Sequence, residues 1–316
     1  MENLDSLVKE MTEVSRKQQD LSNYENISEN LKQMIRASFH EEVQIHFFGS
    51  RIIGLAEKDS DLDIYIEFNK SFFANAIISK TNDERLLKLA KIICHAPNWC
   101  LKETVLRTRI PIIISVYNPL NMDCDISTTN GLSTENSKLL AYLFKIQPEA
   151  VSLFHFIREW LKTKNFTQFK GYTLTLLLTF FLQQKCLMPT ISAVQNAIPE
   201  VRIDGFNVSF DNSRSLNYYK ISKITDYKNH VQSFFQFYAD FDFSKVMCLF
   251  TGKSIALSNY KQRYPKFLAK GIYLPGPCNR ASNGGVVDFD YKTRFVNVCT
   301  ISPSCLELFF NNNLKL

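Results

Sequence analysis

Two nearby segments decide the fold of this chain: His46-Phe47-Phe48-Gly49-Ser50 and Asp61-Leu62-Asp63-Ile64-Tyr65-Ile66. Val43, Ile45 and Phe47 alternate with Gln44 and His46, which is the period of a strand. The second segment continues to Phe68 in residues that favour β-structure. The pattern predicts a strand, a Gly-Ser turn, a short connector and a second strand that carries Asp-x-Asp.

The two aspartates define a candidate metal site. Side chains at i and i+2 of a strand point to the same face, so Asp61 and Asp63 are expected side by side. Two carboxylates that close repel each other unless a cation neutralises them, and Mg²⁺, with Mn²⁺ as the alternative, suits a few carboxylates plus substrate phosphates. Gly49 lets a phosphate approach the backbone, and Ser50 offers a hydroxyl and an N–H.

Each half of this pattern has a simpler interpretation when it stands alone. Asp-x-Asp is common among surface carboxylates, and Gly-Ser is an ordinary turn. Together, between two apolar strands, they resemble the signature of the DNA polymerase β-type nucleotidyltransferases.

A third carboxylate is expected downstream, because two-metal phosphoryl transfer commonly uses one. Asp123 and Asp125 share a face of a short predicted strand, and Cys124-Asp125-Ile126-Ser127 resembles the family pattern at this point. The resemblance selects Asp125 as the third catalytic metal ligand. Without the upstream motif, both residues would be interpreted as solvated carboxylates at a sheet edge.

Composition limits the class of protein. The chain has 316 residues, 45% hydrophobic and 13% aromatic, which is enough for two domains with large cores. Its net charge of +6 suits a polyanionic partner such as RNA. Eight cysteines without a Cys-x-x-Cys motif, and no signal peptide, indicate a cytoplasmic or nuclear compartment. The longest apolar run, 172–182, is too short to span a bilayer, so no membrane association is expected.

Periodicity predicts the order of elements. Helices are expected at 3–18, 24–38, 83–96, 134–146, 148–164, 171–186 and 228–239, and strands at 43–48, 62–68, 110–117 and 123–127. From 271 to 300 strand and loop are expected, followed by a last helix near 303–311.

Sequence blocks in the second half of the chain make the resemblance more specific. Several blocks are similar, in the same order, to noncanonical poly(A) polymerases and terminal uridylyltransferases: Asn130-Gly131-Leu132, 156–162, Gly171-Tyr172-Thr173-Leu174, 212–216 and 234–243. The resemblance implies an α+β chain with a nucleotidyltransferase catalytic domain at 20–130, in which helices accompany a mixed sheet. It also implies a mostly helical poly(A)-polymerase-associated domain at 131–316, with the helix at 1–19 packed on it and the active site in the cleft between the domains.

Several residues of the second half are candidate nucleotide ligands. Arg158 and Lys162 are four residues apart on one helix face and can clamp a triphosphate, although such a pair is by default a solvated face. Tyr172 can stack on a base, and the resemblance implies that Asn130 holds the ribose hydroxyls. The alternatives are a core tyrosine and a turn asparagine.

Departures from the family pattern bear on base choice. Ser282-Asn283 stands where uridylyl-specific members carry His before Asn, and Gly171 replaces the usual Ser. Because a pocket histidine reads uracil, its absence favours ATP or loose selectivity over UTP. Residues 260–270 interleave cations and aromatics, so Lys261, Arg263 and Lys266 are candidate contacts for an RNA 3′ end, or else part of an ordinary basic loop.

These features predict a template-independent RNA 3′-terminal nucleotidyltransferase that uses NTP and a single-stranded RNA 3′ end, with an RNA-binding protein as a possible source of specificity. A UTP-specific terminal uridylyltransferase is the alternative within this class. Two alternatives lie outside this class. The first is a catalytically silent RNA-binding scaffold, and the three carboxylates argue against it. The second is a synthase of nucleotide second messengers, and the 212–216 and 234–243 blocks argue against it.

Overall fold

The computed structural model describes residues 3–68, 71–73, 79–106, 110–167, 169–285 and 289–313. The chain divides into two compact units. The sheet unit comprises Val14–Ala141 and Pro199–Ser209, and the helical unit comprises Met1–Glu13, Tyr142–Ile198 and Phe210–Leu316. The fold class is α+β, as predicted. The domain limits near residue 130 and the place of the active site between the domains stay predictions.

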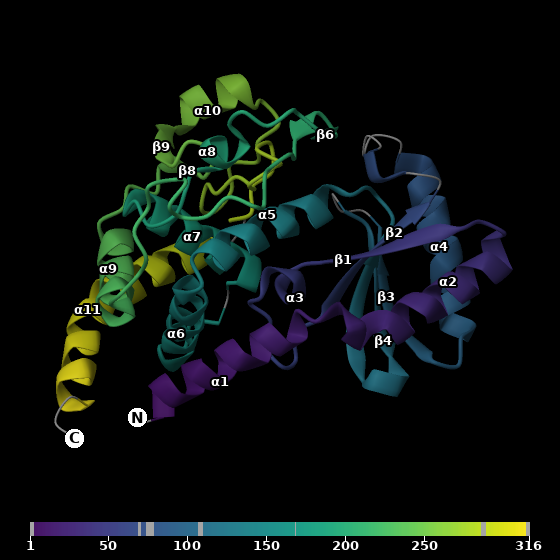
Figure 1. The fold of residues 1–316 in the computed structure, drawn as a ribbon, viewed down its shortest axis with the longest axis horizontal. Coiled ribbons are helices and arrows are strands. Elements are labelled where there is room, and N and C mark those ends of the chain that lie inside the picture. Colours follow the sequence, from purple (N-terminus) through teal and green to yellow (C-terminus); the bar gives the residue numbers. More distant parts are fainter. Residues whose placement is uncertain are drawn as a thin grey trace. The chain divides into compact units, whose positions relative to one another are not determined.

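A mixed five-stranded sheet organises the sheet unit, in the order β1-β2-β5-β4-β3 (Figure 1). The strands are β1 (Val43–Phe48), β2 (Leu62–Phe68), β3 (Trp99–Val105), β4 (Ile112–Tyr117) and β5 (Met122–Ser127). β2 runs parallel to β5, and the other neighbours are antiparallel. The predicted strands are confirmed, whereas β3 was not predicted, because this edge strand carries Lys102 and Glu103 between its apolar residues.

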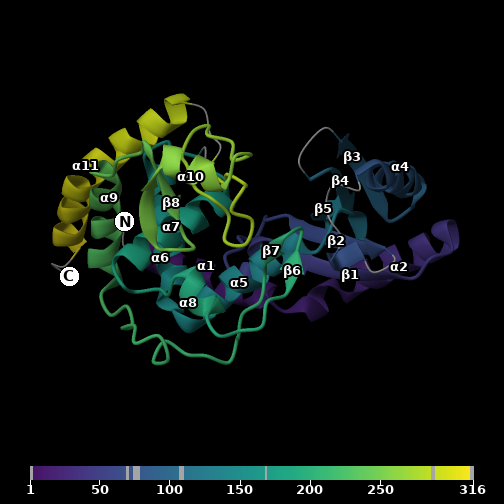
Figure 2. The same ribbon diagram turned by 90° about the horizontal axis from the view of Figure 1, so that it is seen from above.

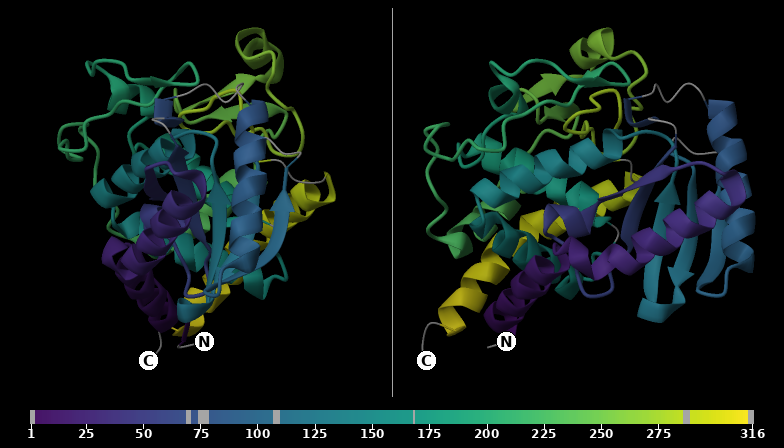
Figure 3. Two further views of the ribbon diagram at one scale, coloured as in Figure 1. Left: turned by 90° about the vertical axis from the view of Figure 1, so that its right-hand side faces the viewer. Right: turned by 45° about the vertical axis from the view of Figure 1, so that its right-hand side comes forward.

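Alternation along β2 separates an apolar face from a polar one. Ile64 and Ile66 are fully buried in a core cluster with Leu31 of α2 (Glu25–Phe39) and Leu89 of α4 (Ser79–His95). α2 and α4 thus cover one face of the sheet, and α4, blue in Figure 3, runs along β3 and β4. Asp63, between Leu62 and Ile64, points to the opposite face. Both helices confirm the prediction.

The remaining elements of the chain are mostly helical. They are α1 (Asn3–Gln18), α3 (Ser50–Ile53), α5 (Leu132–Ile146), α6 (Glu149–Thr163), α7 (Gly171–Gln184), α8 (Ile191–Gln195), α9 (Tyr227–Ala239), α10 (Leu257–Arg263) and α11 (Phe289–Asn313), with hairpins β6–β7 (Arg202–Ile203, Phe206–Asn207) and β8–β9 (Lys245–Cys248, Lys253–Ala256), and 3-10 turns at Leu21–Tyr24, Ser71–Phe73 and Asn118–Leu120. The predicted helices are confirmed. Among the described residues, no helix is both long enough and apolar enough to cross a membrane.

The prediction of strand and loop up to residue 300 was wrong, because 289–300 already belong to α11. Phe295, Cys299 and Leu306 are buried at helical spacing, and α11 lies beside α9 (Figure 2). Pro303, at the start of the predicted helix, lies inside α11. Its carbonyl accepts a hydrogen bond from Gln232 Nε2 of α9 at 3.4 Å, so packing stabilises a helix that this proline interrupts locally.

Candidate active site

Gly49 is fixed by the backbone and by a neighbouring carboxylate. It follows β1 with φ 76° and ψ −158°, a conformation that favours glycine, and leads directly into α3. A Cβ at this position would overlap the carboxylate of Asp63. The Gly49 N–H donates to Ser137 Oγ at 2.9 Å, and the Ser137 hydroxyl donates to the carbonyl of Ser133, also at 2.9 Å. The structure therefore brings Gly49 and Asp63 together and anchors the turn to α5.

Asp63 and Asp125 stand opposite each other in the sheet. Their Cα atoms are register partners in the parallel ladder between β2 and β5. Side chains of directly paired residues lie on the same face, so the two carboxylates share the face that the core helices leave uncovered. Asp61 precedes β2, two residues before Asp63, at the same end of the strand. Asp63 and Asp125 thus come from two adjacent strands, and Asp61 is the residue directly before one of them.

Asp123 is the fourth carboxylate of this region. It forms an ion pair with Lys102 of β3, with 2.5 Å between Lys102 Nζ and Asp123 Oδ1. The hydrogen bond to Asp123 raises the pKa of Lys102, which therefore stays charged. Of the two aspartates on β5, Asp125 is the one whose Cα pairs with that of Asp63, whereas Asp123 is held by a lysine.

The environment of Asp61 disfavours the charged form of its carboxyl group. Partial burial of its carboxyl group raises its pKa, and the negative charge of Asp123 raises it further. Arg51 and Lys102 oppose this shift. A divalent cation beside Asp61 would therefore be favourable, because it would offset the repulsion between Asp61 and Asp123.

Arg51 is a residue of this region that the sequence analysis missed. It is 3% exposed, and its Nε donates to the carbonyl oxygens of Ser60 at 3.1 Å and Asp61 at 3.2 Å. Its Nη1 donates to the hydroxyl of Tyr24 at 3.0 Å. The sequence signal for this role is an arginine directly before the largely apolar run 52–56.

The donor set suits Mg²⁺, which prefers carboxylate oxygens completed by water and substrate phosphates. Asp63 and Asp125 supply oxygens from one face of the sheet, and the Asp63 carboxylate packs against the backbone of Gly49. In the described part of the chain, no three or more His, Cys, Asp or Glu side chains stand close enough to hold an ion by themselves. The paired carboxylates of Asp63 and Asp125 are a donor set that Mg²⁺ accepts when water or substrate oxygens complete its coordination.

One face of α6 in the helical unit carries three basic side chains. His155, Arg158 and Lys162 are spaced at i, i+3 and i+7. His155 is fully buried, and burial, reinforced by the charges of Arg158 and Lys162, lowers its pKa to about 4. Lys162 Nζ pairs with Glu159 Oε1 at 2.6 Å. Glu159 therefore competes with a phosphate for the charge of Lys162.

The guanidinium of Arg158, a residue of α6, lies close to the start of α7. A Cβ on Gly171 would be 3.1 Å from Arg158 Nη1, so the glycine leaves room for the guanidinium. Tyr172 is 37% exposed, and a Cβ on Gly284 would be 3.0 Å from its ring. Thr173 Oγ1 donates to the Gly284 carbonyl at 2.8 Å. The structure thus brings Arg158, Tyr172 and the loop at 282–285 to the same end of α7.

Asn283 holds this loop in shape. Its Oδ1 accepts from the N–H groups of Leu274 at 2.9 Å and Gly285 at 3.0 Å. Its Nδ2 donates to the carbonyls of Leu268 at 3.0 Å and Lys270 at 2.9 Å. These bonds use the full capacity of the amide, so a structural role is what the geometry shows. Its predicted role in nucleotide binding stays a prediction, as does that of Ser282, whose N–H donates to the Asn279 carbonyl at 3.2 Å.

The remaining predicted residues lie apart from these groups. Asn130 is buried, and its Oδ1 accepts from the Leu132 N–H at 3.1 Å at the start of α5. Lys261 and Arg263 of α10 and the following Lys266 are exposed. Within the described residues, none of these three cations forms an ion pair.

Comparisons with known proteins show which proteins this chain is similar to. Residues 4–145 match the family model of the central palm domain of poly(A) RNA polymerase, mitochondrial-like. The chain is 26% identical over 267 residues to the mitochondrial poly(A) RNA polymerase of Drosophila melanogaster, covering 72% of this chain and 43% of that protein. It is 27% identical over 198 residues to terminal uridylyltransferase 4 of Homo sapiens, covering 60% and 12%. The chain therefore spans less than half the length of these relatives.

Solved structures share the fold. The structure of mtPAP in complex with UTP has a TM-score of 0.78 at 19% identity, over 96% of this chain and 68% of that chain. The structure of a mutant of the Cid1 poly(U) polymerase bound to MgATP has a TM-score of 0.71 at 20% identity, over 96% of this chain and 94% of that chain. These likenesses confirm the α+β architecture. Together with the sequence matches, they show that the chain is similar to noncanonical poly(A) polymerases and terminal uridylyltransferases, and that residues 4–145 match the palm-domain model.

Proposed function

We propose that the protein transfers nucleotides from NTP to the 3′-hydroxyl of RNA without a template. The observation that carries this proposal is the pairing of Asp63 with Asp125 across the β2–β5 ladder, with the Asp63 carboxylate packed against the backbone of Gly49. Paired carboxylates beside a glycine turn suit phosphoryl transfer, in which catalysis is mainly positioning and charge stabilisation.

Asp61, Asp63 and Asp125 would hold Mg²⁺ or Mn²⁺. When bound, the metal ions supply charge that activates the RNA hydroxyl and stabilises the leaving pyrophosphate. The raised pKa of Asp61 supports this assignment, because the folded chain gathers negative charge that a cation relieves.

The chain's own residues position the nucleotide. Gly49 and Ser50 seat the β- and γ-phosphates, because the glycine lets them reach the backbone. Arg158 and Lys162 stabilise the charge that develops on the leaving pyrophosphate. Tyr172 stacks on the base through its exposed ring, and Asn130 holds the ribose.

We propose ATP use or loose base selectivity, with UTP specificity as the alternative. Ser282 stands where the family resemblance implies a uracil-reading histidine. The mtPAP structures that share this fold were determined with UTP, CTP, ATPγS and GTP, which supports a pocket that accepts several bases.

Lys261, Arg263 and Lys266 are proposed to contact the RNA backbone. They are exposed, and residues 243–285 contain seven cations and no Asp or Glu, which favours a polyanion. A protein that binds RNA is a proposed partner for specificity. All eight cysteines are described and are free thiols, which supports a reducing cytoplasmic location.

The test is incorporation of each NTP separately into a labelled single-stranded RNA, with Mg²⁺ or Mn²⁺. Asp63→Ala should abolish extension, whereas Asp59→Ala, which removes an exposed carboxylate of the preceding loop, should retain it. Extension that survives Asp63→Ala overturns the site. Absence of extension with every nucleotide and several RNAs favours the silent scaffold, and soluble oligonucleotides made without RNA favour the second-messenger synthase.

A further inference from the structure

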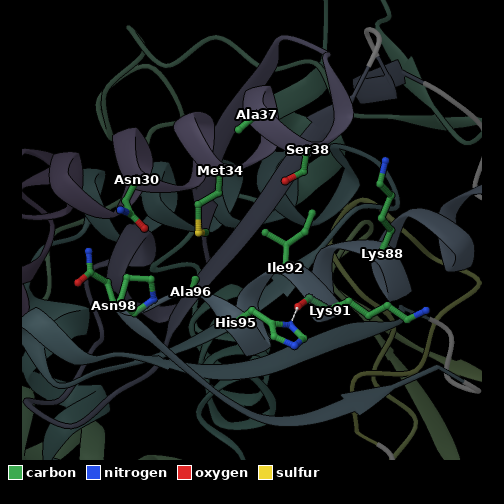
Figure 4. A pocket seen from close by; sticks show the side chains of 11 residues that line it. Asn30, Met34, Ala37, Ser38, Lys88, Lys91, Ile92, His95, Ala96 and Asn98 are labelled. Atoms are coloured by element: carbon green, nitrogen blue, oxygen red, sulfur yellow. Dashed lines mark hydrogen bonds between the residues drawn. The ribbon is translucent and has the colours of Figure 1, made fainter.

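A groove of about 540 Å³ runs between α2 and α4 in the sheet unit (Figure 4). Its middle is apolar, where Met34 of α2 faces Ile92 of α4 and Ala37 lies at the rim. Leu31 and Ile35 of α2 are fully buried in the core below, so the groove is a second, adjacent apolar strip of the same helix. The groove is therefore a surface that a further apolar chain can cover.

The rim of the groove on α4 is basic. Lys88, Lys91 and His95 are spaced at i, i+3 and i+7, and no lining residue is Asp or Glu. Lys88 Nζ lies 4.3 Å from the ring centroid of Phe39, and Lys91 forms no ion pair with any described residue. His95 Nδ1 donates to the Lys91 carbonyl at 2.7 Å, which leaves Nε2 as the other polar atom of the ring. The rim thus offers a row of positive groups that the described chain does not neutralise.

The residues that line the groove favour one kind of binding partner over the others. No Phe, Tyr or Trp lines the groove, and His95 carries the one aromatic ring among the lining residues, so single-stranded RNA lacks a row of rings on which to stack its bases. A second copy of this chain, with net charge +6, adds positive charge to positive charge. An apolar floor beside a basic rim is instead complementary to a chain with apolar side chains on one face and carboxylates on the next, as in helix-in-groove recognition.

We propose that the groove binds a short acidic amphipathic segment of a partner protein. Its apolar side chains enter between Met34 and Ile92, and its carboxylates meet Lys88 and Lys91. Because α2 and α4 cover the sheet face opposite to Asp63, the bound segment leaves Asp63 and Asp125 uncovered. The groove can therefore tether the protein without blocking its carboxylates, and the binding does not depend on the proposed activity.

The test selects peptides from a random phage-displayed library on the full chain and titrates the enriched peptides by fluorescence anisotropy. Ala37→Trp fills the groove from an exposed position that the fold tolerates, and Lys91→Glu reverses charge at the rim. Lys58→Glu, exposed in the same unit but outside the groove, is the matched control. Thermal unfolding of each variant confirms that it folds.

We expect enriched peptides to be acidic, with apolar residues three or four apart. Their Kd should rise at least about tenfold in Ala37→Trp and in Lys91→Glu but stay unchanged in Lys58→Glu. Peptides without acidic residues, or equal binding to the Ala37→Trp variant, overturn the proposal. So does a single-stranded oligoribonucleotide that loses affinity in both variants while no peptide is enriched, since the groove would then be an RNA surface.

Discussion

The buried guanidinium of Arg51 is bonded to the main chain of Asp61, with 3.2 Å from Arg51 Nε to the Asp61 carbonyl oxygen. The same guanidinium holds the Ser60 carbonyl and the Tyr24 hydroxyl, which in turn donates to the Gln18 carbonyl at 2.9 Å. One side chain therefore joins α3, the Asp61 loop and the start of α2. Its charge also opposes the rise in the pKa of Asp61.

Arg51→Met should loosen this loop. The change leaves buried carbonyl and hydroxyl oxygens without donors, each at a cost of about 1–3 kcal/mol, so the free energy of unfolding should fall by several kcal/mol. The pKa of Asp61 should rise further, because an opposing cation is lost. Urea unfolding measures the first effect. Arg36→Met, which removes an exposed arginine paired with Glu42, is the control and should change stability little. Equal losses in the two variants contradict the proposed role of Arg51.

Gly49→Ala should remove activity through its contact with Asp63. The Cβ would displace the Asp63 carboxylate, and misplacement of a catalytic group costs about 100-fold in rate. Gly205→Ala is the control for backbone strain. Gly205 has φ 79°, close to the φ of 76° at Gly49, so both substitutions strain the backbone. No atom lies near the Cβ position of Gly205, so only Gly49→Ala also displaces a side chain. Both variants should lose stability, and only Gly49→Ala should lose extension of a labelled RNA. Retained extension in Gly49→Ala contradicts the placement of the site.

Asp61 makes stability depend on pH in an unusual direction. Its pKa is raised in the folded chain, so the folded state holds the proton more tightly than the unfolded state. Stability from this group is therefore present at pH below its ordinary range and is lost as pH rises through the folded pKa. Asp61→Asn should stabilise the metal-free protein at pH 7 but not at pH 3, measured by urea unfolding in EDTA.

Magnesium should reverse this penalty. Because the ion relieves repulsion at Asp61, adding Mg²⁺ at pH 7 should raise the melting temperature of the wild type more than that of Asp61→Asn. Asp204→Asn, a change in the β6–β7 turn, is the control and should respond to Mg²⁺ like the wild type. An identical response of all three proteins would show that Asp61 does not bind the ion.

His155 should produce the opposite pH dependence. Burial lowers its pKa to about 4, so stability from the neutral ring is complete above pH 6.5 and is lost as pH falls towards the folded pKa. The loss should reach about 3 kcal/mol by pH 4. His155→Leu should flatten the profile of unfolding free energy between pH 6.5 and 4, whereas His230→Leu, at a partly buried histidine with a smaller downward shift, should flatten it less.

The sequence predicts local periodicity well and long-range partners poorly. Alternation identified β1 and β2, because it depends on neighbours within a strand. The shared face of Asp61 and Asp63 stays a prediction, since Asp61 lies just before β2. The sequence analysis missed the burial of Arg51, because its acceptors lie ten residues away and on another helix. It also missed the structural role of Asn283, because the main-chain groups that its amide bonds are brought together only in the folded loop.

Ser282→His tests whether the loop at 282–285 determines base choice. Because Asn283 holds this loop through four main-chain hydrogen bonds, a neighbouring side chain can change while the loop keeps its shape. We expect the histidine to raise the ratio of UTP to ATP incorporation about tenfold, as one added base contact provides. Ser282→Asn is the control for size and should leave the ratio nearly unchanged. Asn283→Ala should instead lower incorporation of all nucleotides alike, because the loop loses its anchor. An unchanged ratio in Ser282→His means that another residue reads the base.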